Sequence, residues 1–162
     1  DKKVDKSLLD EMLLAANLAP SWKNSQTPRF YVATGEKSKN AVREALPEFN
    51  RKNSENASAY IVTTVVLNRS GFDKDGTAVT EIGNGWGYYD LGLNNMALLL
   101  KATELGISTL VMGIRDGEKL RKEFDIPETE AVVSVIAVGY TDSEIVRPKR
   151  KSVEDFSKFY ED

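Results

Sequence analysis

The sequence contains neither cysteine nor histidine among its 162 residues. The absence of cysteine excludes disulfides, thiolate nucleophiles and cysteine-ligated metal sites. The absence of histidine removes the side chain that serves most often as a general base and as a metal ligand, so we expect no metal site. Any catalysis must therefore come from carboxylates, amines, hydroxyls or a bound cofactor. A cofactor needs from its protein mainly binding, orientation and electrostatic tuning.

The sequence also lacks an excess of positive charge and a long apolar run. Its formal net charge is −3, whereas a nucleic-acid-binding protein usually carries a basic face. No apolar run reaches the roughly 20 residues that a membrane-spanning helix needs, and residues 1–5 do not resemble a signal peptide. We therefore expect no nucleic-acid partner and no membrane partner. The lack of cysteine favours a reduced, cytoplasmic location.

The length and the composition are those of one globular domain. Apolar residues make up 41% of the chain and aromatic residues 9%. A chain of this size buries about 68–70% of its unfolded surface, which is enough for a core without disulfides or metals. We expect a single domain over residues 1–162.

Hydrophobic spacing predicts alternating helices and strands. The run 60–67 is β-branched without alternation, which is typical of a strand covered on both faces. The segment 88–104 is apolar around most of its circumference, which predicts a buried helix. Together the pattern predicts an α/β fold of the α+β kind, with a buried central helix. The expected helices are 6–19 (with Asp5 as N-cap), 37–46, 88–104, 117–124 and 153–160, with a loop or short helix at 49–56; the expected strands are 29–34, 60–67, 108–112 and 131–138.

Two motifs resemble known binding sites but lack features that those sites require. The glycines of 83–87 resemble a dinucleotide fingerprint, but the third comes one residue early and no strand precedes them, so we interpret them as a loop entering a helix. Residues 73–76 resemble half of a calcium loop, but Ile82 stands where the bidentate glutamate belongs, which favours a surface turn. Both motifs lie within or beside a long loop, 69–85, whose length suggests function. Phe72 or Trp86 could form the aromatic edge of a substrate pocket there, and a core position is favoured for Trp86.

Two polar segments leave alternatives open. The loop 21–26 is rich in amides and hydroxyls, which suit either a turn that caps the preceding helix or recognition of the edge of a flat heterocycle. The run 149–151 is cationic and is either a solvated tail or a phosphate clamp, since arginine offers a bidentate fork to phosphate oxygens.

A set of short motifs resembles the nitroreductase family, in that family's order, from about residue 4 to residue 156. The resemblance rests on all of these motifs together and on their order, because no single motif is decisive. Its members are the helix ending 18–21, Asn24-Ser25-Gln26, Arg29-Phe30, Trp86 with 90–92 and 98–102, the strand and turn at 105–109 and 112–113, and 138–140 followed by 147–151.

The resemblance implies a fold and an assembly. It implies a mixed central sheet flanked by helices, and an intertwined homodimer with two FMN sites at the subunit interface. It implies that FMN carries hydride from NAD(P)H, through flavin N5, to a small electron-poor acceptor such as a nitroaromatic or a quinone, by a ping-pong mechanism. No side chain would then be catalytic in its own right. The cofactor-binding residues that it implies are Pro20, Ser21, Trp22, Asn24, Gln26, Asn50, Asn53, Met112, Gly113, Lys149 and Arg150.

The resemblance also gives these residues roles. The loop from Pro20 to Asn24 would face the flavin of the partner subunit, and Asn50 would lie at the flavin pyrimidine edge. Met112 and Gly113 would lie beside the isoalloxazine ring, and Lys149 and Arg150 would reach the ribityl phosphate.

Three departures from the family pattern bear on these roles. The Arg-Ser-x-Arg stretch with which the family binds the FMN phosphate has no counterpart in the sequence. Residues 26–28 read Gln-Thr-Pro in place of Gln-Pro-Trp, which removes an aromatic wall that Trp22 could replace. Asn53 stands where relatives carry a lysine, a cation that Lys23 or Lys52 could supply. A flavin-binding protein without turnover and a cofactor-free structural dimer therefore stay open as alternatives.

Overall fold

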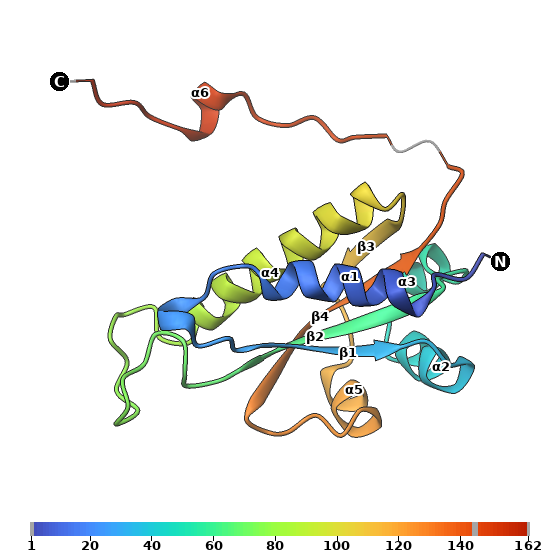
Figure 1. Ribbon diagram of the computed structural model, residues 1–162, viewed down its shortest axis with the longest axis horizontal. Helices are drawn as coiled ribbons and strands as arrows, with labels where there is room; N and C mark the ends of the chain where they lie inside the picture. The colour runs from blue at the N-terminus through green and yellow to red at the C-terminus, as the bar shows by residue number, and fades with distance from the viewer. Residues whose placement is uncertain (1, 144–145, 162) are drawn as a thin grey trace.

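A computed structural model describes residues 2–143 and 146–161 and shows a four-stranded sheet between helices (Figure 1). The strands are β1 (Pro28–Ala33), β2 (Ala59–Val66), β3 (Ser108–Met112) and β4 (Glu130–Gly139), in the order β1-β2-β4-β3. The α+β class and the four strands are as expected. The pairing differs from the expected mixed sheet, because all three strand pairs are antiparallel. Strands β2 and β3 run in the same direction, but β4 lies between them and prevents a parallel pair.

The helices agree with the predicted pattern to within a few residues at their ends. Helix α4 ends where expected, because Gly106 takes a left-handed conformation with φ +69° and reverses the chain into β3. The tail helix α6 is shorter than the predicted 153–160. The helices are α1 (Lys6–Asn17), α2 (Glu36–Glu44), α3 (Glu48–Asn53), α4 (Gly85–Glu104), α5 (Gly117–Glu123) and α6 (Val153–Phe156), with a 3₁₀ turn, η1 (Trp22–Asn24).

Two hydrophobic clusters lie on opposite faces of the sheet. One cluster joins the sheet to α1 and α4 through Met12, Leu98 and Ile136. The other joins it to α2 and α5 through Val42, Leu120 and Val135. Side chains of β2 alternate between the two clusters, and all but its last residue are buried. The prediction of a strand covered on both faces is confirmed.

Helix α4 is the predicted central helix, and in the single chain it is buried along one side. Leu91, Leu98 and Ala102 face the sheet and α1 and are almost completely buried. Met96 and Leu100 are 51% and 59% exposed. The apolar surface of this helix is therefore larger than the area that its own chain covers.

Helix α4 also begins at Gly85, three residues earlier than the expected start at residue 88. Glycine disfavours helix on propensity alone. Close packing overrides this preference at Gly87, where a Cβ atom would come within 2.9 Å of the Val65 side chain. The last glycine of the segment that resembles a nucleotide motif thus lets the first turn of α4 lie against β2.

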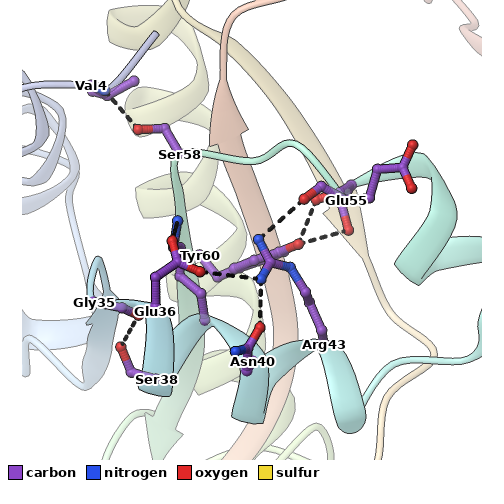
Figure 2. Close-up of polar contacts among 11 residues, drawn as sticks. Val4, Gly35, Glu36, Ser38, Asn40, Arg43, Glu55, Ser58 and Tyr60 are labelled. Atoms are coloured by element: carbon purple, nitrogen blue, oxygen red, sulfur yellow. Dashed lines mark hydrogen bonds and ion pairs between the residues drawn. The ribbon is translucent and has the colours of Figure 1, made fainter. Parts of the chain in front are cut away.

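A polar network fixes α2 and the segment that follows α3 (Figure 2). Arg43 donates to Asn40 Oδ1 at 2.7 Å and to the Glu55 carbonyl at 3.1 Å, and its guanidinium lies 5.7 Å from the centre of the Tyr60 ring. The buried Tyr60 hydroxyl donates to the carbonyl of Ser54. Because Ser54 and Glu55 directly follow α3, this network holds the end of that helix against β2.

The C-terminal tail leaves the sheet after β4 and runs clear of the helical layers (Figure 1). Its large side chains are exposed, with Val146 at 85% and Tyr160 at 87%. Within the described residues, no helix is long and apolar enough to cross a membrane.

The phenol of Tyr31 makes the stability of this sheet pH-dependent in alkali. Burial raises its pKa to about 12, and the hydrogen bond that it donates to Glu130 at 2.9 Å adds to the rise. An unfolded tyrosine titrates near pH 10, so the unfolded chain loses its proton first. The stabilisation by the neutral phenol is complete below about pH 10 and is lost as the pH rises to about 12. We expect the free energy of unfolding, measured by urea titration, to fall more steeply over this range in the wild type than in Tyr31→Phe. Tyr160→Phe, on the exposed tail, is the control, and equal slopes in wild type and Tyr31→Phe would contradict the assignment.

Candidate functional site

The loop between α1 and β1 has a strained backbone. Lys23, Asn24 and Gln26 all have positive φ, at 46°, 55° and 48°. A non-glycine residue in this region costs on the order of 1–3 kcal/mol, and such residues gather at binding and catalytic sites. Asparagine tolerates the conformation better than lysine or glutamine does. Residues 20–26 are called the cofactor loop below, because the sequence resemblance predicts cofactor contacts there. They need outside support to keep their shape.

The buried carboxylate of Asp90 supplies part of that support from α4. Both of its oxygens lie 3.1 Å from the backbone nitrogen of Trp22, which donates to them. The Ser70 hydroxyl donates to Asp90 Oδ2 at 2.5 Å and also lies 2.6 Å from the hydroxyl of Ser25 and 3.1 Å from that of Thr27. Asp90, Ser70 and Thr27 are each no more than 2% exposed. One buried polar cluster thus joins the cofactor loop, the long loop 69–85 and α4.

An aromatic cluster forms a second junction between the same segments. The rings of Trp22 and Trp86 lie 4.7 Å apart, and Trp86 meets Tyr89 edge-on at 5.8 Å. The Trp86 indole donates to Thr80 in the long loop at 2.7 Å. Trp86 is half-buried and belongs to neither core cluster, which corrects the core position that the sequence favours for it. The indole N–H of Trp22 is buried without a partner.

The cofactor loop borders a small cavity of about 330 Å³, to which Ser21, Gln26 and Arg29 contribute polar groups. A larger cavity of about 760 Å³ lies elsewhere, between the segment after α3 and the start of β3, and Asn53 lines it. The two cavities share no lining residue. The expected cofactor residues therefore do not converge on one cavity of this chain.

Four of the predicted residues gather around α3 and the end of β3. The Asn50 amide donates to the Ile114 carbonyl at 3.2 Å, which draws α3 against the segment that follows β3. Asn53 and Gly113 are exposed. The Met112 side chain is only 2% exposed and packs in the core, so its backbone is what remains for a ligand.

The two predicted phosphate ligands lie apart from both groups. Lys149 and Arg150 are exposed on the tail. Arg150 donates to the carbonyl of Pro148 at 3.4 Å, a contact within the tail itself. The predicted site residues thus form three groups: the cofactor loop, the α3–β3 group and the tail.

Sequence reasoning assigned no role to Asp90 or Ser70. A signal for Asp90 existed, because it shares the buried side of α4 with Leu91, Asn94 and Leu98, where an acidic side chain needs donors. No comparable signal marked Ser70, one polar residue in a polar loop.

The residues present are chemically suited to a flat, polar-edged cofactor. Asn24 and Gln26 are exposed amides that offer both donors and acceptors, and Lys23 adds a cation beside them. The tail adds two further cations, which suit a phosphate. In the single chain, the cofactor loop and Asn53 line two different cavities, and the two cations lie on the tail.

Comparisons with known proteins agree with this fold. The family described as the nitroreductase family matches residues 1–140, which leaves the basic run of the tail outside the match. No curated protein matches the chain. A nitroreductase family protein from Streptococcus pneumoniae TIGR4 superposes with a TM-score of 0.83 at 22% identity, over 99% of this chain and 92% of that chain.

Two further solved structures are similar. CLA-ER, an enone reductase of gut-bacterial fatty acid saturation metabolism, gives a TM-score of 0.85 at 20% identity, over 98% of this chain and 89% of that one. An oxidoreductase containing FMN gives a TM-score of 0.75 at 25% identity, over 88% and 70%.

The contact between Asn50 and Ile114 predicts a structural role that needs no ligand. Replacing Asn50 by alanine should lower the free energy of unfolding by about 1 kcal/mol, because a largely buried hydrogen bond is lost. Asn53→Ala, on the exposed side of the same short helix, should stay within about 0.5 kcal/mol of the wild type. Urea unfolding without added ligand measures both. An Asn50→Ala variant as stable as the wild type would show that Asn50 is free to serve a ligand alone.

Proposed function

We infer that this chain, which belongs to the nitroreductase family, is an FMN-dependent oxidoreductase that acts as a homodimer. The observation that carries the proposal is the strained, polar cofactor loop, held in place by a buried carboxylate of the central helix. FMN, when bound, would supply the redox chemistry by taking hydride from NAD(P)H and passing it to a small electron-poor acceptor in a ping-pong cycle. The solved FMN-containing oxidoreductase supports the choice of cofactor.

The task of the chain's own residues is to bind and to orient. Asn24 and Gln26 would hold the polar edge of the cofactor, and Lys149 and Arg150 would hold its phosphate. The Asn50 amide group is engaged by Ile114, which leaves its oxygen for a ligand. Asn53 would complete this group from the end of α3. The backbone at Met112 and Gly113 would flank the flat ring, and the aromatic Trp22 would exclude water at the cofactor loop. No side chain is required as an acid or a base, which is consistent with a sequence that lacks histidine.

A second copy of the chain is proposed because one chain leaves too much apolar surface uncovered. Leu14 and Leu18 near the end of α1 are 62% and 78% exposed, and Tyr89, Met96 and Leu100 on α4 are similarly exposed. Helices α1 and α4 pack together, so these side chains come from adjoining elements. Large exposed apolar patches mark interaction sites. A dimer built on this surface would bring the cofactor loop of one chain toward the α3–β3 group of the other.

The tail gives the proposed dimer its intertwined form. Strand β3 is an edge of the sheet, and its Leu110 and Val111 are 39% and 47% exposed. The tail carries exposed Phe156 and Phe159 and lies apart from the helical layers of its own chain (Figure 1). We propose that each tail lies on the partner subunit and takes Lys149 and Arg150 to the partner's side of the interface.

The proposal predicts a flavin spectrum that responds to reduced nicotinamide. After FMN loading and gel filtration, the protein should retain flavin absorbance, and anaerobic NADH or NADPH should bleach it, because hydride transfer reduces the ring. Turnover then requires steady nicotinamide oxidation in the presence of a quinone or nitroaromatic acceptor. Retained flavin without turnover would indicate a sensor or store. A protein that stays colourless with excess FMN would indicate a cofactor-free dimer.

The dimer has a separate test in one exposed leucine of α4. Leu100→Glu should convert a species of twice the chain mass into monomer, because obligate interfaces bury about 2,000 Å² or more and do not tolerate an unpaired buried charge. Size-exclusion chromatography with light scattering gives the mass. The matched control is Val79→Glu, an exposed apolar residue of the long loop, which should remain dimeric. A monodisperse wild-type monomer in the presence of FMN would count against the whole arrangement.

A further inference from the structure

We propose that Asp90 is a positioning residue that locks the cofactor loop and the long loop 69–85 to helix α4, so that the two loops move as one unit. The inference rests on the proposed function in one respect: it assumes that the cofactor loop contacts FMN. It goes beyond that function by assigning a role to a side chain that would touch neither cofactor nor substrate.

The hydrogen bonds of Asp90 are the first argument. Its carboxylate is 2% exposed, and the salt bridges of the described residues do not include it. A buried carboxylate without a cation must be stabilised by hydrogen-bond donors. Those donors come from the two loops: the Trp22 backbone N–H from the cofactor loop, and the Ser70 hydroxyl from the long loop. Neither loop can leave Asp90 without uncovering a charge that is held in a water-poor place.

The strain of the cofactor loop is the second argument. Three of its seven residues are left-handed without being glycine. Its internal hydrogen bonds are short-range: Asn24 N–H to the Ser21 carbonyl, Ser25 N–H to the Trp22 carbonyl, and Gln26 N–H to the Ser21 hydroxyl. Strained backbone persists only where the surroundings over-determine it. Asp90 binds the loop at Trp22, directly before the first left-handed residue, and reaches Ser25 through Ser70.

The ion pair at the loop surface and the aromatic cluster extend the same unit. Lys23 lies 3.3 Å from Asp73 of the long loop, and Trp22 packs on Trp86 at the start of α4. The ion pair is exposed and contributes little by itself. The buried cluster at Asp90 is the part of this junction that water does not reach, so it sets the position of the loops relative to α4.

The two tryptophans give a direct readout of the junction, since they are the only two in the sequence. Their rings lie 4.7 Å apart and tilted by 46°, so they should give a coupled signal in circular dichroism. This signal reports the position of the cofactor loop on α4 in protein without FMN. The dissociation constant of FMN, from quenching of flavin fluorescence, reports the consequence for the cofactor.

The experiment compares Asp90→Leu with Asp90→Asn in the full chain. Leucine has a similar branching pattern, is somewhat larger and removes both acceptors. We expect it to abolish the tryptophan couplet and to weaken FMN binding by about tenfold or more, because hydrogen bonds to a charged group are the stronger class. Asparagine keeps one oxygen for the Trp22 amide and should rescue most of the couplet and part of the affinity. The control pair is Glu44→Leu and Glu44→Gln, on the exposed side of α2, which should match the wild type.

The outcomes separate this proposal from the proposed function. If the wild type binds no FMN, the proposed function fails, and loss of the couplet in Asp90→Leu alone still supports the positioning role. A folded Asp90→Leu variant that keeps the couplet and the wild-type affinity overturns the role. If Asp90→Leu does not fold, Ser70→Ala decides the matter. A diminished couplet in Ser70→Ala supports the locking of the two loops, and a wild-type couplet in this variant overturns it.

Discussion

Strand β2 has no face turned to water, and the arrangement of the chain follows from this. A strand buried on both sides needs a helical layer above and another below it. Helices α1 and α4 supply one layer, and α2 and α5 supply the other. Because α4 connects β2 to β3 across the sheet, its first turn must lie against β2, and Gly87 permits that contact. The same contact places Asp90 one turn further along α4, beneath the two loops that it binds.

The polar groups that suit a cofactor sit at the margins of this core. The cofactor loop follows α1 at one place, α3 and the end of β3 lie at another, and the tail leaves the body altogether. Within one chain the cofactor loop and Asn53 border separate cavities. The apolar surfaces of α1 and α4 are uncovered in the same single chain. A second chain would resolve both features at once, which is why the assembly and the cofactor belong to one proposal.

The sequence predicted the elements well because the signals there are local. β-Branched runs, the proline after α1 and the glycine after α4 determine structure within a few residues of themselves. The prediction was wrong where a distant contact decided the outcome. Gly85 and Gly87 favour a loop by propensity, but both are helical, and Gly87 packs closely against Val65. The antiparallel pairing depends on β4 entering between β2 and β3, which no local pattern encodes.

The candidate site likewise contains residues that the sequence predicted and residues that only a distant contact identifies. The cofactor loop, Asn50 and the Met112–Gly113 turn were predicted from the family resemblance, and the structure brings Asn50 to the segment after that turn. Asp90 and Ser70 were missed because their importance comes from a contact across 20 positions of the chain. The sequence predicted α4 as a buried helix, but an apolar circumference does not say whether the surface that covers it belongs to the same chain.

The half-covered helix α4 has a thermodynamic consequence. If the outer surface of α4 is covered only by association, the folded state is stabilised by mass action, and its stability rises with the logarithm of protein concentration. A melting temperature for such a chain has meaning only at a stated concentration. Dilution then acts as a mild denaturant, which loosens first the surface that holds Met96 and Leu100.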